Sequence, residues 1–399
     1  MLVVIKAGFD EELLAVAERW ELMCTQIGVV TGTGRLEVLS AGHTVADVPC
    51  NDLVLGGGAP QYELAAVKPA YLEQAEKLDL GSLPEPADYS QVLLRLLARP
   101  NTAHKGYVFE QYDSTIRTNT VVGPGADSAV IRVKGTAKAL ALTTDGNGRY
   151  VYLNPYNGGM TAVAEAARNV VCSGGRPLAI TNCLNFGNPN DPGIFYQFRE
   201  AVAGMGAACR ALNTPVTGGN VSFYNENAEG AIYPTPVIGM LGLVDDQRHI
   251  TTPGFKKAND FIVALGSING EIGGSEYLEM QYGKVIGPPP ALDLETEINV
   301  QDVCLEAIRS GIINSAHDIS DGGLAVCLAE SMLEADPGLG ADVHVSRRLR
   351  NDELLFGESQ STIIVTLDEK NLLALQRIAM GSQVPCATIG RVTENDRLT

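Results

Sequence analysis

The most regular alternation of apolar and polar positions covers residues 101–250. Strand-like segments there alternate with two long helices, one following Gly158 and Gly159 and one over about residues 195–212. This order is typical of an α/β domain, because each helix can bury its apolar face on the sheet. The strand-like segments are AVIRV, ALALTT, YVYL, PLAIT and TPVIGMLGLV.

A second α/β pattern covers residues 252–399. It opens on the apolar segment FIVALG and later contains TIIVTL and ATIGRV, which predict strands. Helices are expected near residues 299–310, 323–334 and 370–380. Together the two patterns predict an α/β protein with mixed sheets. Its 399 residues exceed the roughly 250–300 residues at which single cores stop growing, so at least two domains are expected.

The first 66 residues have a shorter pattern of the same kind. Residues 10–20 predict a helix, with Asp10 as its capping residue. About sixty residues is thin for a free-standing domain, so we interpret residues 1–66 as the end of a larger domain. Strands are expected at residues 2–6, 27–30 and 36–39.

Residues 67–100 separate this first segment from the first full α/β pattern. Pro69, Pro84 and Pro86 interrupt regular structure there, and the helical sequence LLRLLARP follows them. This composition predicts a linker.

Composition limits the classes of function. The formal net charge of −18 opposes nucleic-acid binding, which depends on Lys and Arg. No apolar stretch approaches the roughly 18 residues of a membrane helix, so neither nucleic acid nor membrane is an expected partner. The eight cysteines form no C-x-x-C pair, and the N-terminal sequence has no export signal. Both features favour a cytoplasmic location.

Several common catalytic motifs are absent from the sequence. The near misses to a phosphate-binding P-loop, TGTGRL (31–36) and LGGGAP (55–60), lack the lysine or the following helix. No H-E-x-x-H, G-x-S-x-G or paired-cysteine pattern occurs. Any catalysis would therefore use carboxylates, amides and glycines.

A glycine-rich segment, TTDGNGRYVYLNPYNGG, covers residues 143–159. Asp145 and Asn147 lie in its turn, and Asn157 with the two following glycines could open a helix whose free N–H groups bind phosphate. A capped helix after a tight turn explains the segment equally well.

Two further segments combine amides with close-approach glycines. In AITNCLNFGNPNDPG the amide of Asn182 can bind a nucleotide or close a turn. In PVTGGNVSFYNE, Asn220 and Ser222 face one side of an extended segment that follows two glycines. Oxygen donors beside such glycines suit a magnesium nucleotide, although an ordinary bulged strand has equal support.

Carboxylates precede a helix in SAHDISDGGLAVCLAESM (315–332). His317, Asp318 and Asp321 stand before Gly322, and the carboxylates could cap the helix or bind a ligand. We favour capping. Glu358 in FGESQS admits both interpretations.

These segments together resemble the synthetase subunit of the phosphoribosylformylglycinamidine synthase family, in the superfamily that includes aminoimidazole ribonucleotide synthetase. The matching stretches extend over nearly the whole chain in order. They are QYDSTIRTNTVVGPGADSAVIRV, LNPYNGGMTAVAEAARNVVCSGGRPLAITNCLNFGNP, VTGGNVSFYNE, GGSEY, HDISDGGLAVCLAESM and FGESQS.

The resemblance implies a tandem organisation, in which each half has an ATP-handling α/β domain followed by a companion α/β domain. Residues 1–66 would then be the end of the first half's companion domain. Residues 101–250 would be the ATP-type domain of the second half, and residues 252–399 its companion domain.

The same resemblance implies site residues. Asn182 and Gly219 would bind ATP, Asn220 would bind magnesium, and Ser222 would bind the formylglycinamide substrate. The family's catalytic histidine would lie in the first ATP-type domain, which this chain does not match, and its counterpart here is Asn147. No catalytic residue is therefore expected within this chain.

The implied reaction is the ATP-dependent conversion of formylglycinamide ribonucleotide and ammonia to the amidine. ATP and Mg²⁺ would be required, and the partners would be a glutaminase subunit that supplies ammonia and a small accessory subunit. An alternative is a non-catalytic half that binds nucleotide as a scaffold, which Asn147 favours. Thiamine-monophosphate kinase is disfavoured because its Asp-rich nucleotide motifs are not found.

Overall fold

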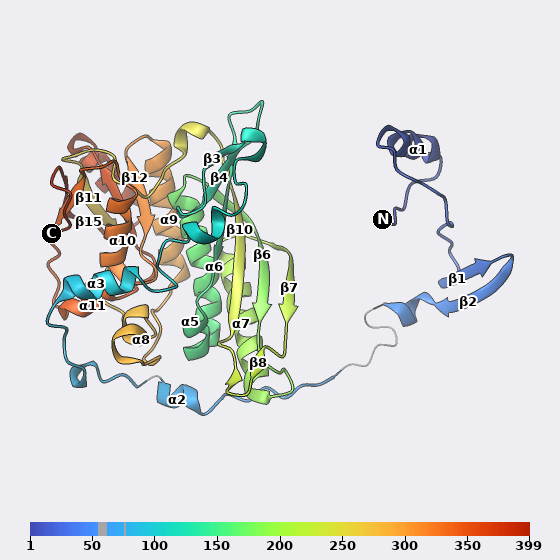
Figure 1. Cartoon of the computed structure of the whole chain (residues 1–399), viewed down its shortest axis with the longest axis horizontal. Helices are drawn as coiled ribbons and strands as arrows, with labels where there is room; N and C mark the ends of the chain where they lie inside the picture. Colours follow the sequence, from blue (N-terminus) through green and yellow to red (C-terminus); the bar gives the residue numbers. More distant parts are fainter. Residues whose placement is uncertain (55–61, 76) are drawn as a thin grey trace. The chain divides into compact units, whose positions relative to one another are not determined.

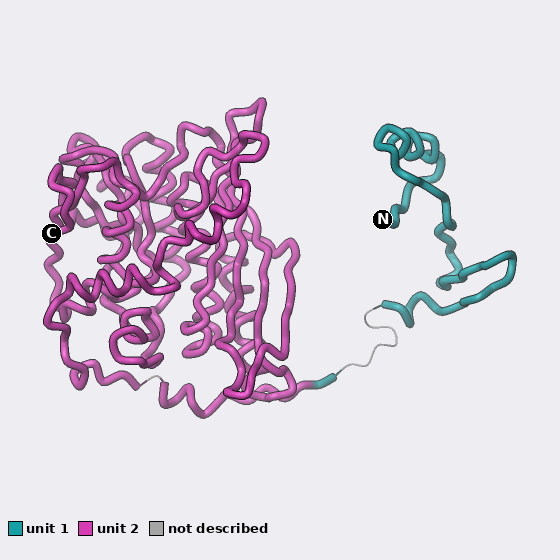
Figure 2. Tube along the Cα trace, viewed as in Figure 1, with its two compact units in different colours: residues 1–63 teal, residues 64–399 magenta. Residues whose placement is uncertain are grey.

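The computed structural model describes residues 1–54, 62–75 and 77–399, which form two separate units (Figure 1). Unit 1 comprises residues 1–63 and unit 2 comprises residues 64–399 (Figure 2). The near-miss motif LGGGAP (55–60) lies outside the described residues. No described helix combines the length and the apolar character that a membrane crossing requires.

Unit 1 contains little buried structure. It has the helix α1 (Asp10–Arg19), the antiparallel strands β1 (Arg35–Ser40) and β2 (His43–Pro49), and a short 3-10 helix. Among its described residues Ala17 alone is buried. The helix and the strand near residues 36–39 are confirmed.

Three other expectations for unit 1, two strands and one helix cap, are wrong. Residues 2–6 and 27–30 are not strands, because no described residue of the unit pairs with them and a lone strand leaves its backbone groups without ladder partners. Asp10 does not cap α1. Phe9 is the N-cap residue, without a side-chain hydrogen bond, and Asp10 is the first helical residue.

The first sheet of unit 2 has the strand order β3-β4-β5-β10-β6-β7. Its neighbours are antiparallel except for the parallel pair of β6 and β7. A small hairpin joins β7 to β10. The strands are β3 (Thr120–Val122), β4 (Ala129–Arg132), β5 (Ala139–Asp145), β6 (Arg176–Asn185), β7 (Val216–Ser222) and β10 (Thr235–Val244), and the hairpin is β8 (Glu226–Asn227) with β9 (Gly230–Ala231).

Two helices, α6 (Pro155–Cys172) and α7 (Pro192–Ala211), cover one face of this sheet. Buried and partly exposed residues alternate along β10, as expected when one face is packed and the other is open. The open face has an apolar hollow of about 610 Å³, lined by residues of β4, β5, β6 and β10.

The segment YVYL is helical, so its prediction as a strand is wrong. It belongs to α5 (Gly148–Leu153), whose first turn is capped by Asn147. The amide oxygen of Asn147 accepts hydrogen bonds from the backbone N–H groups of Arg149, at 3.1 Å, and Tyr150, at 3.2 Å. This cap starts a helix where the β-branched and aromatic composition alone favours a strand.

The second sheet of unit 2 is antiparallel, with the order β12-β14-β11-β15-β13. Helices α9 (Leu294–Arg309) and α12 (Leu372–Gly381) pack on one face, and α10 (Gly323–Leu333) packs on the other. All three helices were expected. The strands are β11 (Phe261–Leu265), β12 (Ser315–Asp318), β13 (Gly340–Val343), β14 (Ile363–Leu367) and β15 (Cys386–Thr393).

The segment 67–100, for which a linker was predicted, is part of unit 2 and packs on the rest of it. It contains α2 (Tyr71–Ala75) and α3 (Tyr89–Leu97), which is capped by Asp88. Leu96 is fully buried, in a cluster that includes residues of α8 (Glu276–Tyr282), α10 and α11 (Asn351–Phe356). Beyond α3, Arg99 pairs with buried Glu276 at 2.6 Å. The short helix α4 (Gly106–Phe109) then leads into β3.

Candidate functional site

Two neighbouring strands carry the four site residues expected from the sequence. Asn182 lies on β6, and Gly219, Asn220 and Ser222 lie on β7, which is the edge strand of the first sheet. The parallel register places Asn182 beside Gly219. The structure therefore brings the four positions together on adjacent strands.

The side chains at these four positions lie on two different faces of the sheet. Asn182 pairs with Ile238 on β10, which is fully buried beneath the helices, so its side chain is on the helix-covered face. A Cβ built at Gly219 would overlap the side-chain oxygen of Asn182, which places this position on the same face. Because side chains alternate along a strand, Asn220 and Ser222 belong to the open face.

Gly219 has a steric reason to be glycine. A Cβ there would also lie 2.7 Å from the backbone oxygen of Asn182, well inside van der Waals contact. At Gly218, in contrast, a Cβ would meet no atom within 4 Å. The close contact of β7 with Asn182 therefore depends on Gly219.

A group of carboxylates begins at Asp145, which lies in one cross-strand row with Asn182 and Gly219. Ile238 pairs with Asp145 on β5 as well as with Asn182 on β6. Strands are spaced by about 4.8 Å, so Asp145 is roughly 10 Å from Asn182 across the sheet. Asp145 thus lies between the candidate nucleotide-binding residues and the region where the two sheets of unit 2 meet.

We call this group the carboxylate cluster. Its members come from both halves of unit 2, and several are partly exposed, so one side of the cluster is open to solvent. Its members are Asp145 of β5, Glu165 of α6, Asp318 of β12, Asp321 before α10, and Glu358 after α11.

Amide and arginine side chains hold the carboxylates in place. The Asn169 amide donates to Asp145 Oδ2 at 3.1 Å, and the Asn147 amide donates to Asp321 Oδ1 at 3.0 Å. Buried Arg168 lies 3.5 Å from Asp318 and 3.7 Å from Glu165. The five carboxylates of the cluster therefore outnumber the arginine side chains beside them.

The pKa values of the cluster carboxyl groups are raised, because these groups are buried and close to one another. Burial, followed by repulsion from Asp318 and Asp321, raises the pKa of Asp145 to about 8. Burial, followed by repulsion from Asp321, raises the pKa of Glu358 to about 8. Burial also raises the pKa of Asp318 to about 6, although Arg168 opposes the shift. A cation that entered the cluster would reverse these shifts.

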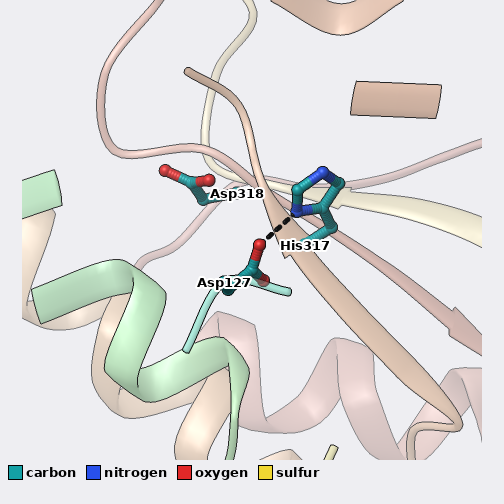
Figure 3. A group of neighbouring side chains, drawn as sticks. All are labelled: Asp127, His317 and Asp318. Atoms are coloured by element: carbon teal, nitrogen blue, oxygen red, sulfur yellow. Dashed lines mark hydrogen bonds and ion pairs between the residues drawn. The ribbon is translucent and has the colours of Figure 1, made fainter. Parts of the chain in front are cut away.

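His317 forms a separate contact next to Asp318. Its ring binds Asp127 at 2.6 Å through Nδ1 (Figure 3). Its Nε2 binds Glu330 at 3.0 Å. Burial disfavours the charged ring, but these two carboxylates raise the pKa of His317 well above its ordinary value. An imidazolium bonded at both nitrogens has no free lone pair, so His317 is a poor metal ligand although it lies within 4.8 Å of Asp127 and Asp318.

The carboxylate oxygens nearby fit a divalent cation better. Asp127 Oδ2 and Asp318 Oδ2 are buried and have no hydrogen-bond partner within the described part of the chain, although Arg168 Nε lies 3.5 Å from Asp318 Oδ2. Oxygen donors of this kind are the ligands that Mg²⁺ prefers, and a cation would satisfy both. The residues present therefore fit a magnesium ion.

Two sequence expectations about helix ends are wrong. Asp318 and Asp321 do not cap α10, since Gly322 is the N-cap, in the left-handed region at φ 83°. The carboxylate at this helix end is Glu358, whose Oε1 accepts a hydrogen bond from the Gly322 N–H at 2.8 Å. Gly158 and Gly159 do not open α6, which begins at Pro155 with Asn154 as N-cap. Both glycines lie inside the helix, where a Cβ would overlap backbone atoms.

Polar residues within one buried helix indicate the carboxylate cluster in the sequence. The helix α6 is buried around most of its circumference, yet it carries Glu165, Arg168 and Asn169. Charged residues in a buried helix need partners, so they indicate a polar site. We had expected the helix but not the role of these three residues.

Family models match two ranges of the chain. The N-terminal domain model of AIR synthase related proteins matches residues 125–244, and the C-terminal domain model matches residues 257–399. The two ranges contain every strand of the two large sheets of unit 2 except β3.

The chain belongs to the AIR synthase related family.

Within this family, the chain is similar to PurL subunits of phosphoribosylformylglycinamidine synthase. The Moorella thermoacetica subunit is 52% identical over 391 residues, covering 98% of this chain and 53% of the relative. The Alkaliphilus metalliredigens subunit is 46% identical over 396 residues, covering 99% and 53%. The chain thus spans about half the length of these curated relatives.

A solved structure supports the fold. Phosphoribosylformylglycinamidine synthase II from Thermotoga maritima matches 98% of this chain and 54% of its own, with a TM-score of 0.59 and 23% identity. At this identity the match supports the AIR synthase related architecture of the two sheets and nothing finer.

Proposed function

We propose that this chain is the part of a PurL-type enzyme that helps convert formylglycinamide ribonucleotide, with ATP and ammonia, to formylglycinamidine ribonucleotide. The observation that carries this proposal is the 52% identity to the Moorella PurL subunit over nearly the whole chain. Solved structures of Thermotoga maritima PurL in complex with ATP and with FGAR agree with it.

The roles proposed for the site residues follow the family resemblance. Asn182, with Gly219 allowing close backbone approach, would bind ATP, and Asn220 would hold Mg²⁺, which would neutralise charge on the ATP phosphates. Ser222 would donate a hydrogen bond to the formylglycinamide substrate.

The chain's own contribution would be binding and orientation. Asn147, which caps α5 and donates to Asp321, is an amide and has no basic group for proton transfer. We therefore place the proton-transferring residue outside this chain. The open face of the first sheet, with its apolar hollow, would face the other half of the complete site.

Residues 1–66 would be the end of the preceding companion domain, and residues 67–100 would connect it to the ATP-type domain of residues 101–250. The companion domain would be residues 252–399. Further proposed partners are a glutaminase subunit and a small accessory subunit, in keeping with a Thermotoga maritima structure named PurLQS. The proposed location is the cytoplasm.

The test is ADP formation with formylglycinamide ribonucleotide, Mg-ATP and saturating ammonium, which bypasses the glutaminase. Turnover is expected when the chain is co-expressed with the part of the Moorella subunit that it does not match, and not from the chain alone. Asn220→Ala and Ser222→Ala should abolish most of the joint activity, whereas Asn227→Ala in the exposed hairpin should not. Turnover by the chain alone would contradict our account of Asn147.

A second candidate function is a nucleotide-binding scaffold, and the carboxylate cluster favours it. The cluster can hold a divalent cation, and its member Asp145 is roughly 10 Å from Asn182 across the sheet. Magnesium-dependent ADP binding by the chain alone, measured by calorimetry, should then be lost in Asp318→Asn and kept in Asn220→Ala. Equal loss in both variants would argue against a separate scaffold site.

A further inference from the structure

A series of ion pairs leads from the segment 67–100 to the carboxylate cluster. It begins at Arg99, which follows α3 and whose Nε lies 2.6 Å from Oε1 of Glu276. The other carboxylate oxygen of Glu276 lies 2.6 Å from Nη1 of Arg149 on α5. Arg149 in turn places Nη2 3.3 Å from Oδ1 of Asp321, a member of the cluster. Arg99 is thus connected with the cluster through two intermediate side chains.

Glu276 is the side chain on which this connection depends. Its carboxylate is fully buried at the start of α8, and it also accepts a hydrogen bond from the amide of Asn101 at 2.9 Å. A buried carboxylate depends on its cations, because water cannot replace them. Without Arg99, the one arginine left beside Glu276 would be Arg149.

Arg149 is shared among several acceptors. Its Nε donates to the backbone oxygen of Gly274 at 3.0 Å, and its Nη1 also lies 3.4 Å from Oε2 of Glu279. Nη2 of Arg99 lies 3.1 Å from the same Glu279 oxygen. With Arg99 in place, two arginines therefore pair with three carboxylates. Without it, Arg149 would be drawn toward the two carboxylates of α8 and away from Asp321.

A backbone contact joins the same elements by a second route. The N–H groups of Glu276 and Gly322 both donate to Oε1 of Glu358, at 2.9 Å and 2.8 Å. Glu358 belongs to the carboxylate cluster, and Gly322 directly follows Asp321. One carboxylate oxygen thus holds both the start of α8 and the residue next to Asp321. A displacement of Glu276 therefore reaches the cluster without passing through Arg149.

We propose that Arg99 is a positioning residue for the carboxylate cluster, acting through Glu276 and Arg149 on Asp321. This inference rests on the proposed magnesium and nucleotide chemistry, and it extends that site to a residue outside both ranges that the family models match. Carboxylates that bind a cation keep their geometry through the groups that contact them. Loss of such an outer partner typically lowers metal affinity about 10- to 100-fold.

The first experiment measures Mg-ADP binding by the full chain with calorimetry. Arg99→Gln should weaken binding at least about 10-fold. Arg99→Lys, which keeps the charge and a donor for Glu276, should restore the affinity to within about threefold. Tighter binding by Arg99→Gln would overturn the proposal, because it is the result expected if Arg99 acted on the cation only by repulsion. Failure of lysine to restore binding would overturn it too, since packing would then replace the ion pair as the cause.

Arg95→Gln is the matched control. Arg95 lies one turn earlier on α3 and contacts the same helix α8, but its partner is the neutral side chain of Gln281, at 3.0 Å. This substitution should change Mg-ADP affinity less than about twofold. Equal weakening by Arg95→Gln and Arg99→Gln would overturn the proposal, because any lost contact between α3 and α8 would then have the same effect.

A double-mutant cycle tests the route to Asp321. Asp321→Asn removes the carboxylate on which Arg99 acts, and it should itself weaken Mg-ADP binding. In this background Arg99→Gln should lower the affinity by less than about a further twofold, because residues of one network are not additive. A further loss as large as in the unaltered chain would overturn the proposed route.

Hydrogen exchange of the metal-free chain separates this inference from the proposed chemistry. Exchange at the backbone N–H of Gly322 should accelerate at least about fivefold in Arg99→Gln and should not change in Arg95→Gln. Unchanged exchange in Arg99→Gln would overturn the positioning role. A chain that binds no Mg-ADP, but in which Arg99→Gln accelerates this exchange, would instead contradict the proposed nucleotide chemistry and leave the positioning of Asp321 supported.

Discussion

At the scale of residues, Gly219 is the position whose identity the structure explains most directly. Gly219→Ala should destabilise unit 2 by about 1–3 kcal/mol, because the new methyl group overlaps the side chain and backbone of Asn182. It should also weaken nucleotide binding. Urea unfolding and ADP titration measure the two effects. Gly218→Ala is the control, since nothing lies within 4 Å of its added Cβ. Similar effects of both substitutions would contradict this account.

The carboxylate cluster predicts an unusual dependence of stability on pH. Asp145, Asp318 and Glu358 have pKa values of about 8, 6 and 8 in the folded chain, above their ordinary values near 4. The folded state therefore binds protons more tightly than the unfolded state. Without divalent cations, the free energy of unfolding should fall as the pH rises from about 4 to 8, as measured by urea denaturation.

Magnesium should oppose this loss. It binds ionised carboxylates, so it should raise the melting temperature more at pH 8 than at pH 5. Asp145→Asn should reduce both the pH dependence and the magnesium response, whereas Glu229→Gln, at an exposed hairpin, should leave both unchanged. A magnesium response that is equal at the two pH values would contradict a cation site in the cluster.

Residue roles were only partly accessible from the sequence. Turn glycines and neighbouring amides singled out Asn182, Gly219, Asn220 and Ser222, and the structure places them on adjacent strands. That Asn182 and Asn220 face opposite sides of the sheet requires the pairing register. Convergence of Glu165 with Asp318 depends on packing between two modules, which no local pattern encodes.

At the scale of elements, α3 is the clearest case of a segment whose role the sequence understated. Leu96→Ala should destabilise unit 2 by about 2–4 kcal/mol, because Leu96 is fully buried. Leu94→Ala, at a side chain that is 59% exposed, should cost less than about 0.5 kcal/mol. Urea denaturation compares them. If both changes were silent, residues 67–100 would act as a loose linker after all.

The long helices were predictable because their apolar periodicity is strong, as in α7 and α9. The misassigned elements depended on less local information. Asn147 starts a helix at YVYL through two side-chain hydrogen bonds, against the composition of that segment. Residues 2–6 and 27–30 have strand composition, but a strand also needs a neighbour, which sequence periodicity does not report.

At the scale of the whole molecule, the two units differ in their cores. Unit 1 buries Ala17 alone among its described residues, whereas unit 2 contains extensive apolar clusters. Limited proteolysis should therefore cut residues 1–54 much faster than the strands of unit 2, because cleavage follows local opening. Mass spectrometry of a time course identifies the sites. Early cuts within β10 or β11 would contradict this prediction.

The organisation of the chain was predictable in outline. Repeated alternation of strands and helices predicted two α/β modules, and the family models match within both predicted ranges. The way in which α6 contacts α9 and β12, and so joins the modules at the carboxylate cluster, depends on tertiary packing.

The row formed by Asp145, Ile238, Asn182 and Gly219 has a consequence for how such chains can diverge. A single-residue insertion in β6 would rotate Asn182 to the open face and bring a neighbour into its place, exchanging the chemistry of the two faces. Selection on this region must therefore act on segment length as well as on residue identity. Among homologous sequences, gaps should accumulate in the hairpin around residues 226–231 and be rare within β5, β6, β7 and β10.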